Sequence, residues 1–210
     1  MNNNNKLNIN LLLHSLLVNL FHPAVLGSVI VLLIDQIIEN GFYKTYNVPD
    51  YVILFSLIVY FSFDFLIAKE NNKGPDVRND YNIVIFISDI IVLISFYMAF
   101  KSIGDSGKIL YLYCSIFMIF LIYMIRDINR PAKRNSESSI DNKNKKKKKD
   151  NYTLMLGIFI LSSLIGLYTI ELSEIIKDSY YAFYSFGILL GAFFYLKYIQ
   201  SFIKTKKSDT

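Results

Sequence analysis

Residues 110–125 read LYLYCSIFMIFLIYMI, and this stretch contains no charged side chain. Residues 51–63 (YVILFSLIVYFSF) and 156–168 (LGIFILSSLIGLY) have the same character. A helix with such a sequence has no polar face wide enough to meet water, so lipid must surround it. Because backbone groups find no water inside a bilayer, apolar blocks of this length predict membrane-spanning helices.

The whole chain repeats this pattern. Of its 210 residues 53% are hydrophobic, and apolar blocks alternate with short segments that contain Gly, Pro and Asn. The predicted fold is an all-α, polytopic integral membrane bundle of about six transmembrane helices. The six blocks are residues 23–38, 51–68, 81–100, 108–125, 152–170 and 180–203.

The first 22 residues have a different pattern, in which polar side chains share one side of a helix opposite a leucine surface. These polar residues are Asn8, Ser15, Asn19 and His22. The pattern predicts a polar tail followed by an amphipathic helix, residues 7–21, that lies in the membrane interface. A secretory signal is the rival interpretation, but His14 and Asn19 interrupt its apolar region and no convincing cleavage site follows.

The basic residues are distributed unevenly between the two sides of the predicted spans. The chain has 22 Lys and Arg residues, and only Lys44, Lys101, Lys108 and Lys177 fall on one side, which leaves 18 on the other. The positive-inside rule therefore predicts that both termini are cytoplasmic, with the cell membrane as the expected location.

A polar, lysine-rich segment divides the chain into two membrane parts. Residues 126–151 contain few large apolar side chains and predict a disordered cytoplasmic loop between a four-helix part (23–125) and a two-helix part (152–203). Residues 204–210 form a short cytoplasmic tail. The loop carries a basic run that should attract anionic lipid headgroups, and without interleaved aromatic residues it does not indicate nucleic-acid binding. The run is Lys145, Lys146, Lys147, Lys148 and Lys149.

Two carboxylates interrupt the apolar blocks, Asp64 and Asp89. A charged Asp at the centre of a membrane helix costs about 2.5 to 3.5 kcal/mol, so both should face the bundle interior. Their helices are consecutive and antiparallel, which brings the two carboxylates within reach of each other. One interpretation is a proton or cation site with Tyr60 and Ser88 as hydrogen-bonding neighbours, and the other is a structural role in packing.

Small residues in the last block predict close helix packing. Gly187 and Gly191 form a GxxxG pattern, which lets helices approach closely in a membrane. The neighbouring helix can belong to the same chain, which we favour, or to a second copy, which would make a homo-oligomer.

The inventory of reactive side chains argues against an enzyme. Two histidines, His14 and His22, and a single cysteine, Cys114, are too few for a conventional metal site, and no nucleotide-binding loop is present. We expect no metal, no cofactor and no catalytic residue. Two function classes follow: a small channel or an ion- or proton-coupled carrier that uses the intramembrane aspartates, or a non-catalytic anchor, effector or regulatory subunit that binds a partner through its cytoplasmic loops.

Overall fold

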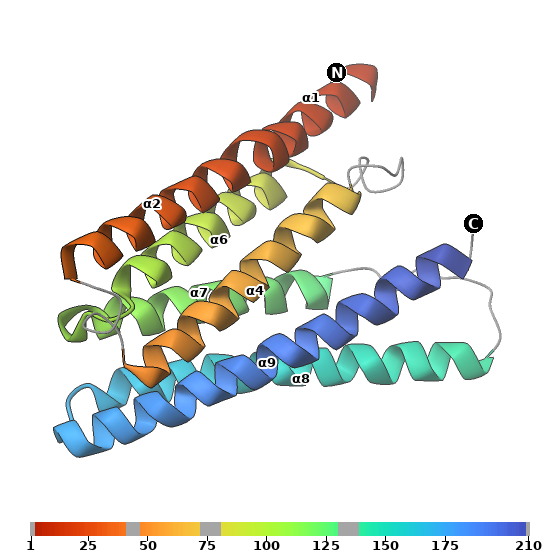
Figure 1. The fold of residues 1–210 in the computed structure, drawn as a ribbon. Helices are drawn as coiled ribbons and strands as arrows, with labels where there is room; N and C mark the ends of the chain where they lie inside the picture. Colours follow the sequence, from red (N-terminus) through yellow and green to blue (C-terminus); the bar gives the residue numbers. More distant parts are fainter. Residues whose placement is uncertain (1–2, 41–46, 72–80, 130–138, 209–210) are drawn as a thin grey trace.

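The computed structural model describes residues 3–40, 47–71, 81–129 and 139–208 (Figure 1). Within these ranges the chain is almost entirely helical and contains no strand, which confirms the predicted all-α bundle. The elements are α1 (Asn3–Leu16), η1 (Leu17–Phe21), α2 (His22–Asn40), α4 (Val48–Asn71), α6 (Ile83–Ser102), η2 (Ser106–Lys108), α7 (Ile109–Asn129), α8 (Ser139–Thr169) and α9 (Glu174–Ser208).

Five helical stretches in the described part of the chain are long and apolar enough to cross a membrane, in agreement with the predicted count of about six. A shorter apolar helix, Thr153–Thr169, accompanies them. The five are Ile9–Leu32, Val48–Leu66, Ile83–Ser102, Ile109–Arg126 and Glu174–Leu196.

The N-terminal segment differs from the prediction of an interfacial helix that ends before Pro23. Instead, α1, η1 and α2 follow one another without a break, and the apolar stretch Ile9–Leu32 runs through all three. Proline ordinarily interrupts a helix because it lacks an N–H and its ring crowds the preceding turn. Here η1 is a π-helical turn, in which the backbone N–H of His22 donates to the carbonyl of Leu17, five residues back. This wider turn lets the helix continue past Pro23.

The lysine-rich loop also differs from the prediction. Residues 130–138 lie outside the described ranges, but α8 begins at Ser139 and includes the lysine run, where the sequence predicts disorder up to residue 151. Lysine is a good helix former, and the apolar half of α8 already provides the nucleus from which helix can propagate. Composition alone does not include this effect of a neighbouring helix.

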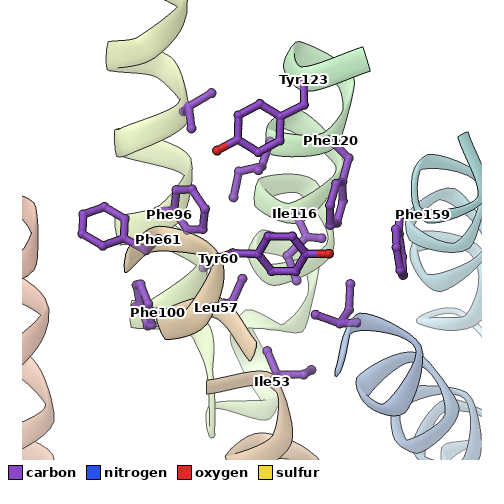
Figure 2. Packing of buried hydrophobic residues seen from close by; sticks show 14 of the residues in the cluster. Ile53, Leu57, Tyr60, Phe61, Phe96, Phe100, Ile116, Phe120, Tyr123 and Phe159 are labelled. Atoms are coloured by element: carbon purple, nitrogen blue, oxygen red, sulfur yellow. The ribbon is translucent and has the colours of Figure 1, made fainter. Parts of the chain in front are cut away.

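The helices pack in a ring around an aromatic core. Going around the ring, the helices follow one another in the order α2, α6, α7, α8, α9 and α4. Helix α4 closes the ring because it also contacts η1 and α6. Figure 2 shows the centre of this arrangement, where Tyr60 of α4 lies near Phe120 of α7 and Phe159 of α8. The Phe120 and Phe159 rings stack with their centres 4.8 Å apart, and the Tyr60 ring lies edge-on to Phe120 with the ring centres 5.7 Å apart.

Polar side chains cap the helices at the end of the bundle that carries the turns. Asn47 and Asp50 cap α4 reciprocally, since each side chain accepts the backbone N–H of the other at 3.1 and 3.0 Å. Asp105 caps η2 in the turn between α6 and α7, where Gly104 has a φ of 78°. The start of α4, the α6–α7 turn and the α8–α9 turn all lie at this end, which we call the turn end (Figure 1). We call the opposite end, where α6 begins and α4 and α7 end, the open end.

Candidate functional site

The π-helical turn places His22 inside the bundle, opposite Asp64 of α4. His22 is only 3% exposed. Its ring lies beside those of Phe61 and Phe65, with ring centres 5.8 and 5.6 Å apart. Its Nδ1 atom is 3.2 Å from the Leu17 carbonyl oxygen, and its Nε2 atom is 3.7 Å from Asp64 Oδ2. The shift in backbone hydrogen bonding that accommodates Pro23 therefore also aims this imidazole at an intramembrane carboxylate.

The geometry of His22 determines where its protons can lie. A carbonyl oxygen only accepts hydrogen bonds, so the Nδ1 atom that faces Leu17 carries a proton. In neutral His22 the Nε2 atom then presents a lone pair to Asp64, and this arrangement is unfavourable if the carboxylate is ionised. One additional proton, on Nε2 or on Asp64, makes the contact attractive.

Asp89 of α6 takes part in a second contact, in which more of its negative charge is compensated by its partners. Arg126 of α7 holds it through Nη2 at 2.5 Å from Oδ1, and the Tyr81 hydroxyl donates to Oδ2 at 2.8 Å. The same Nη2 atom donates to the carbonyl of Ile85 at 3.3 Å. Asp89 thus has a cationic partner and a neutral donor, and its charge is largely neutralised within the protein.

Tyr81 precedes the first turn of α6 and lies outside the apolar stretch Ile83–Ser102. Burial raises the pKa of the Tyr81 hydroxyl above its ordinary value, and the negative charge of Asp89 raises it further. The phenol therefore stays protonated at physiological pH and keeps donating to Asp89. Its ring also meets the His14 ring edge-on at 4.8 Å, which connects α1 to this contact.

The two contacts form one assembly, which we call the intramembrane polar cluster. Its members are His22, Asp64, Tyr81, Asp89 and Arg126. The two contacts are adjacent, since Phe21, the residue before His22, meets Phe86 of α6 with ring centres 6.1 Å apart. With neutral His22 the cluster carries two negative charges and one positive charge, and a proton bound by the His22–Asp64 pair brings its net charge to zero.

The structure places the other predicted neighbours of the carboxylates elsewhere. Tyr60 stacks on Tyr195 of α9 with ring centres 5.2 Å apart, in the interface among α4, α7 and α9. Ser88 donates to the carbonyl of Val84 in its own helix at 2.8 Å. The direct partners of Asp64 and Asp89 are His22 and Arg126.

Neither partner is predicted from the sequence, for identifiable reasons. Arg126 follows the apolar block of α7, and composition alone predicts it to be a loop charge, although α6 and α7 are joined by a short turn and must lie side by side. The guanidinium of a residue at the end of a membrane helix can reach several ångströms along its neighbour. The sequence predicts His22 at the interface because Pro23 indicates a helix start, and no local pattern indicates a π-helical turn.

A separate group of buried polar side chains lies toward the turn end. The Tyr181 hydroxyl donates to Asp50 Oδ1 at 2.6 Å, which fastens the start of α9 to the capped start of α4. The hydroxyls of Tyr184 and Ser163 bond each other at 2.8 Å, and Tyr180 donates to the Ser162 carbonyl. Each contact joins two helices, so these tyrosines stabilise the packing of α9.

The two glycines of the GxxxG pattern have different surroundings. A Cβ atom built on Gly191 would lie 2.3 Å from the Phe159 ring and 2.7 Å from the Tyr60 hydroxyl, whereas one on Gly187 would touch Phe159 only at 4.0 Å. Of these two glycines, Gly191 is therefore the one at which α9 packs closely against its neighbours. The side chains of Lys145 to Lys149 lie outside the described residues.

Among the described residues, no group of three or more His, Cys, Asp or Glu side chains is arranged to hold a metal ion. The cluster itself consists of groups that exchange or hold protons or carry charge: one imidazole, two carboxylates, a phenol and a guanidinium. Comparison of the chain with protein-family models, with curated proteins and with solved structures finds no match in any of the three.

Proposed function

We propose that this protein is a proton-coupled membrane carrier or channel in which the His22–Asp64 pair binds the proton. The observation that carries the proposal is the 3.7 Å contact between His22 Nε2 and Asp64 Oδ2 inside a membrane-spanning bundle. Ionisable residues within a membrane are energetically expensive and usually mark ion pathways or proton relays. A pair whose attraction depends on one exchangeable proton is suited to such a role.

The two aspartates have different roles in this proposal. Asp89 has a permanent cationic partner in Arg126, so its charge remains constant while the protein works. Among the described residues, the ionic partner of Asp64 is the titratable His22, and the Asp64 side chain is 23% exposed in the protein, which leaves an approach for a proton. Asp64 is therefore the residue that gains and loses the proton, and Asp89 supplies a fixed negative charge nearby.

A flux measurement tests this function. Purified protein is reconstituted into liposomes, and proton movement driven by a pH gradient is followed with an internal pH-sensitive dye. Wild type should acidify the lumen faster than protein-free liposomes, whereas Asp64→Asn should fall to the protein-free rate. The amide keeps the shape and the hydrogen-bonding capacity of the side chain but cannot ionise.

The controls separate loss of chemistry from loss of folding. Asp178→Asn removes an exposed carboxylate of α9 far from the cluster in sequence and should retain the wild-type rate. His22→Asn should also abolish flux, because it keeps an amide donor for the Leu17 carbonyl but removes Nε2. A wild-type protein that is folded and monodisperse yet moves no protons would refute the proposal.

The structure also favours a second candidate function, that of a partner-binding membrane subunit. Helix α8 begins 14 residues before its apolar part (139 to 153), and α9 continues 12 residues beyond its own (196 to 208). At about 1.5 Å per residue, these extensions are roughly 21 and 18 Å long. Both leave the bundle at the open end (Figure 1). A folded protein without proton flux would leave this as the better explanation.

We also propose that the open end faces the cytoplasm, as the 18 to 4 distribution of basic residues favours. In a Cys114→Ser background, single cysteines at Asn47, Ser106 and Ser173 should react with an impermeant thiol reagent added to intact cells. Cysteines at Asn72, Ser138 and Ser208 should react only after the cells are permeabilised. Labelling of the second set in intact cells would reverse the orientation.

A further inference from the structure

A groove of about 650 Å³ runs along α2 beside α6. Its volume falls within the range of small-molecule sites, roughly 300 to 1,000 Å³. It is separate from the intramembrane polar cluster, and no residue of the cluster lines it. The lining residues are Ala24, Gly27, Ser28, Val31, Leu32, Asp35, Tyr97 and Lys101.

Small residues of α2 create this groove. Ala24, Gly27 and Ser28 share one helix face, since positions separated by three and four residues are neighbours on a helix. A Cβ atom built on Gly27 would meet nothing within 4 Å, so the space beside it is open. Ser28 turns its hydroxyl back to donate to the Ala24 carbonyl at 2.9 Å, which leaves the floor of the groove largely apolar.

The groove has a polar mouth and an apolar interior. Lys101 lies one residue before the end of α6 and lines the mouth of the groove. Asp35 lies eleven residues after Ala24 in α2, so Ala24 is about 16 Å farther from the mouth along the helix. Half the hydrocarbon thickness of a bilayer is roughly 15 Å. The groove is therefore as deep as one lipid leaflet, with opposite charges at its mouth.

These two charges have no ion-pair or hydrogen-bond partner in the part of the chain that the structure describes. Lys101 and Asp35 are both exposed and both line the groove. A ligand that carries an anionic and a cationic group together would neutralise both. Basic side chains near the membrane surface bind lipid phosphates, and a carboxylate binds an ammonium group through charge-assisted hydrogen bonds.

We infer that this groove binds one phospholipid whose headgroup carries a phosphate and a primary ammonium, as in phosphatidylethanolamine. The phosphate contacts Lys101, the ammonium contacts Asp35, and one acyl chain lies along Val31 and Gly27 toward Ala24. A lipid is the occupant because the groove lies between two membrane-spanning helices and its interior has the depth of a leaflet. This inference is independent of proton transport.

Native mass spectrometry of the protein released from nanodiscs tests the inference. The nanodiscs contain equal parts of phosphatidylethanolamine, phosphatidylcholine and phosphatidylglycerol, and the lipid retained on the protein is identified. Wild type should retain one phosphatidylethanolamine. Gly27→Leu, which places a bulky side chain in the groove, should lose it, while Gly157→Leu on α8 should retain it; at both glycines an added Cβ atom would meet nothing within 4 Å. Lys101→Gln should retain less phospholipid of every class.

The Asp35→Asn variant distinguishes recognition of the headgroup from attraction by charge alone. Without the carboxylate, the preference for phosphatidylethanolamine over phosphatidylglycerol should disappear. Retention by Gly27→Leu equal to that of wild type would overturn the inference. A wild-type preference for phosphatidylglycerol would also overturn it, because Lys101 would then be attracting anionic lipid without any contribution from Asp35.

Discussion

Replacement of Arg126 by glutamine should lower the free energy of unfolding markedly, because it leaves Asp89 without its cationic partner. Removing one partner of a fully buried ion pair costs about 3 to 5 kcal/mol, and we expect a smaller loss here because the two side chains are 26% and 14% exposed. Asp89 would keep its negative charge about 9 Å inside α6, six residues from Ile83, with Tyr81 as its remaining donor. Thermal unfolding in detergent measures the change. The expected result is a large fall in the unfolding temperature together with more aggregated protein on gel filtration.

The double variant identifies the cause. Asp89→Asn together with Arg126→Gln removes both charges and should be considerably more stable than Arg126→Gln alone, since no unpaired charge remains. Lys108→Gln is the matched control, because it breaks an exposed pair with Asp105 in the turn that joins the same two helices and should change stability by less than about 1 kcal/mol. Equal losses for Lys108→Gln and Arg126→Gln would contradict the assignment.

The second large effect is expected at Gly191. Alanine there would bring a Cβ atom to 2.3 Å from the Phe159 ring and 2.7 Å from the Tyr60 hydroxyl. Phe159 cannot easily move aside, since it stacks on Phe120 and is buried. Overpacking of this kind costs about 1 to 3 kcal/mol, and we expect the unfolding temperature in detergent to fall accordingly.

Gly157→Ala provides a matched comparison, because its new Cβ atom would meet nothing within 4 Å. Alanine is a better helix former than glycine by about 0.5 to 1 kcal/mol, so this variant should be unchanged or slightly stabilised. Phe159→Leu combined with Gly191→Ala should recover part of the lost stability by providing room. A Gly191→Ala protein as stable as Gly157→Ala would show that α9 is not closely packed at this position.

The fold class could be predicted because membrane helices are specified by local composition. A block such as residues 110–125 has only one stable state in lipid, whatever its neighbours do. The start of α2 could not be predicted in the same way. Pro23 indicates a helix start under local rules, and only the accommodating π-helical turn, together with packing against α6, makes the helix continuous. The helical lysine run of α8 depends in the same way on the apolar helix that follows it.

The candidate site shows the same division between local and tertiary information. The energetic cost of Asp64 and Asp89 within apolar blocks is visible in the sequence, and the structure places both in one polar cluster. Their partners are not visible, because the choice of Arg126 over Ser88, and of His22 over Tyr60, depends on helix rotation and neighbour order. Those properties are set by packing among side chains far apart in the chain.

Helices α6 and α7 are connected to each other at two places along their length. The short turn joins the helices at one end, and the bond between Asp89 and Arg126 joins them near the other. Two helices joined near both ends resist being pulled apart, so α6 and α7 should behave as one unit.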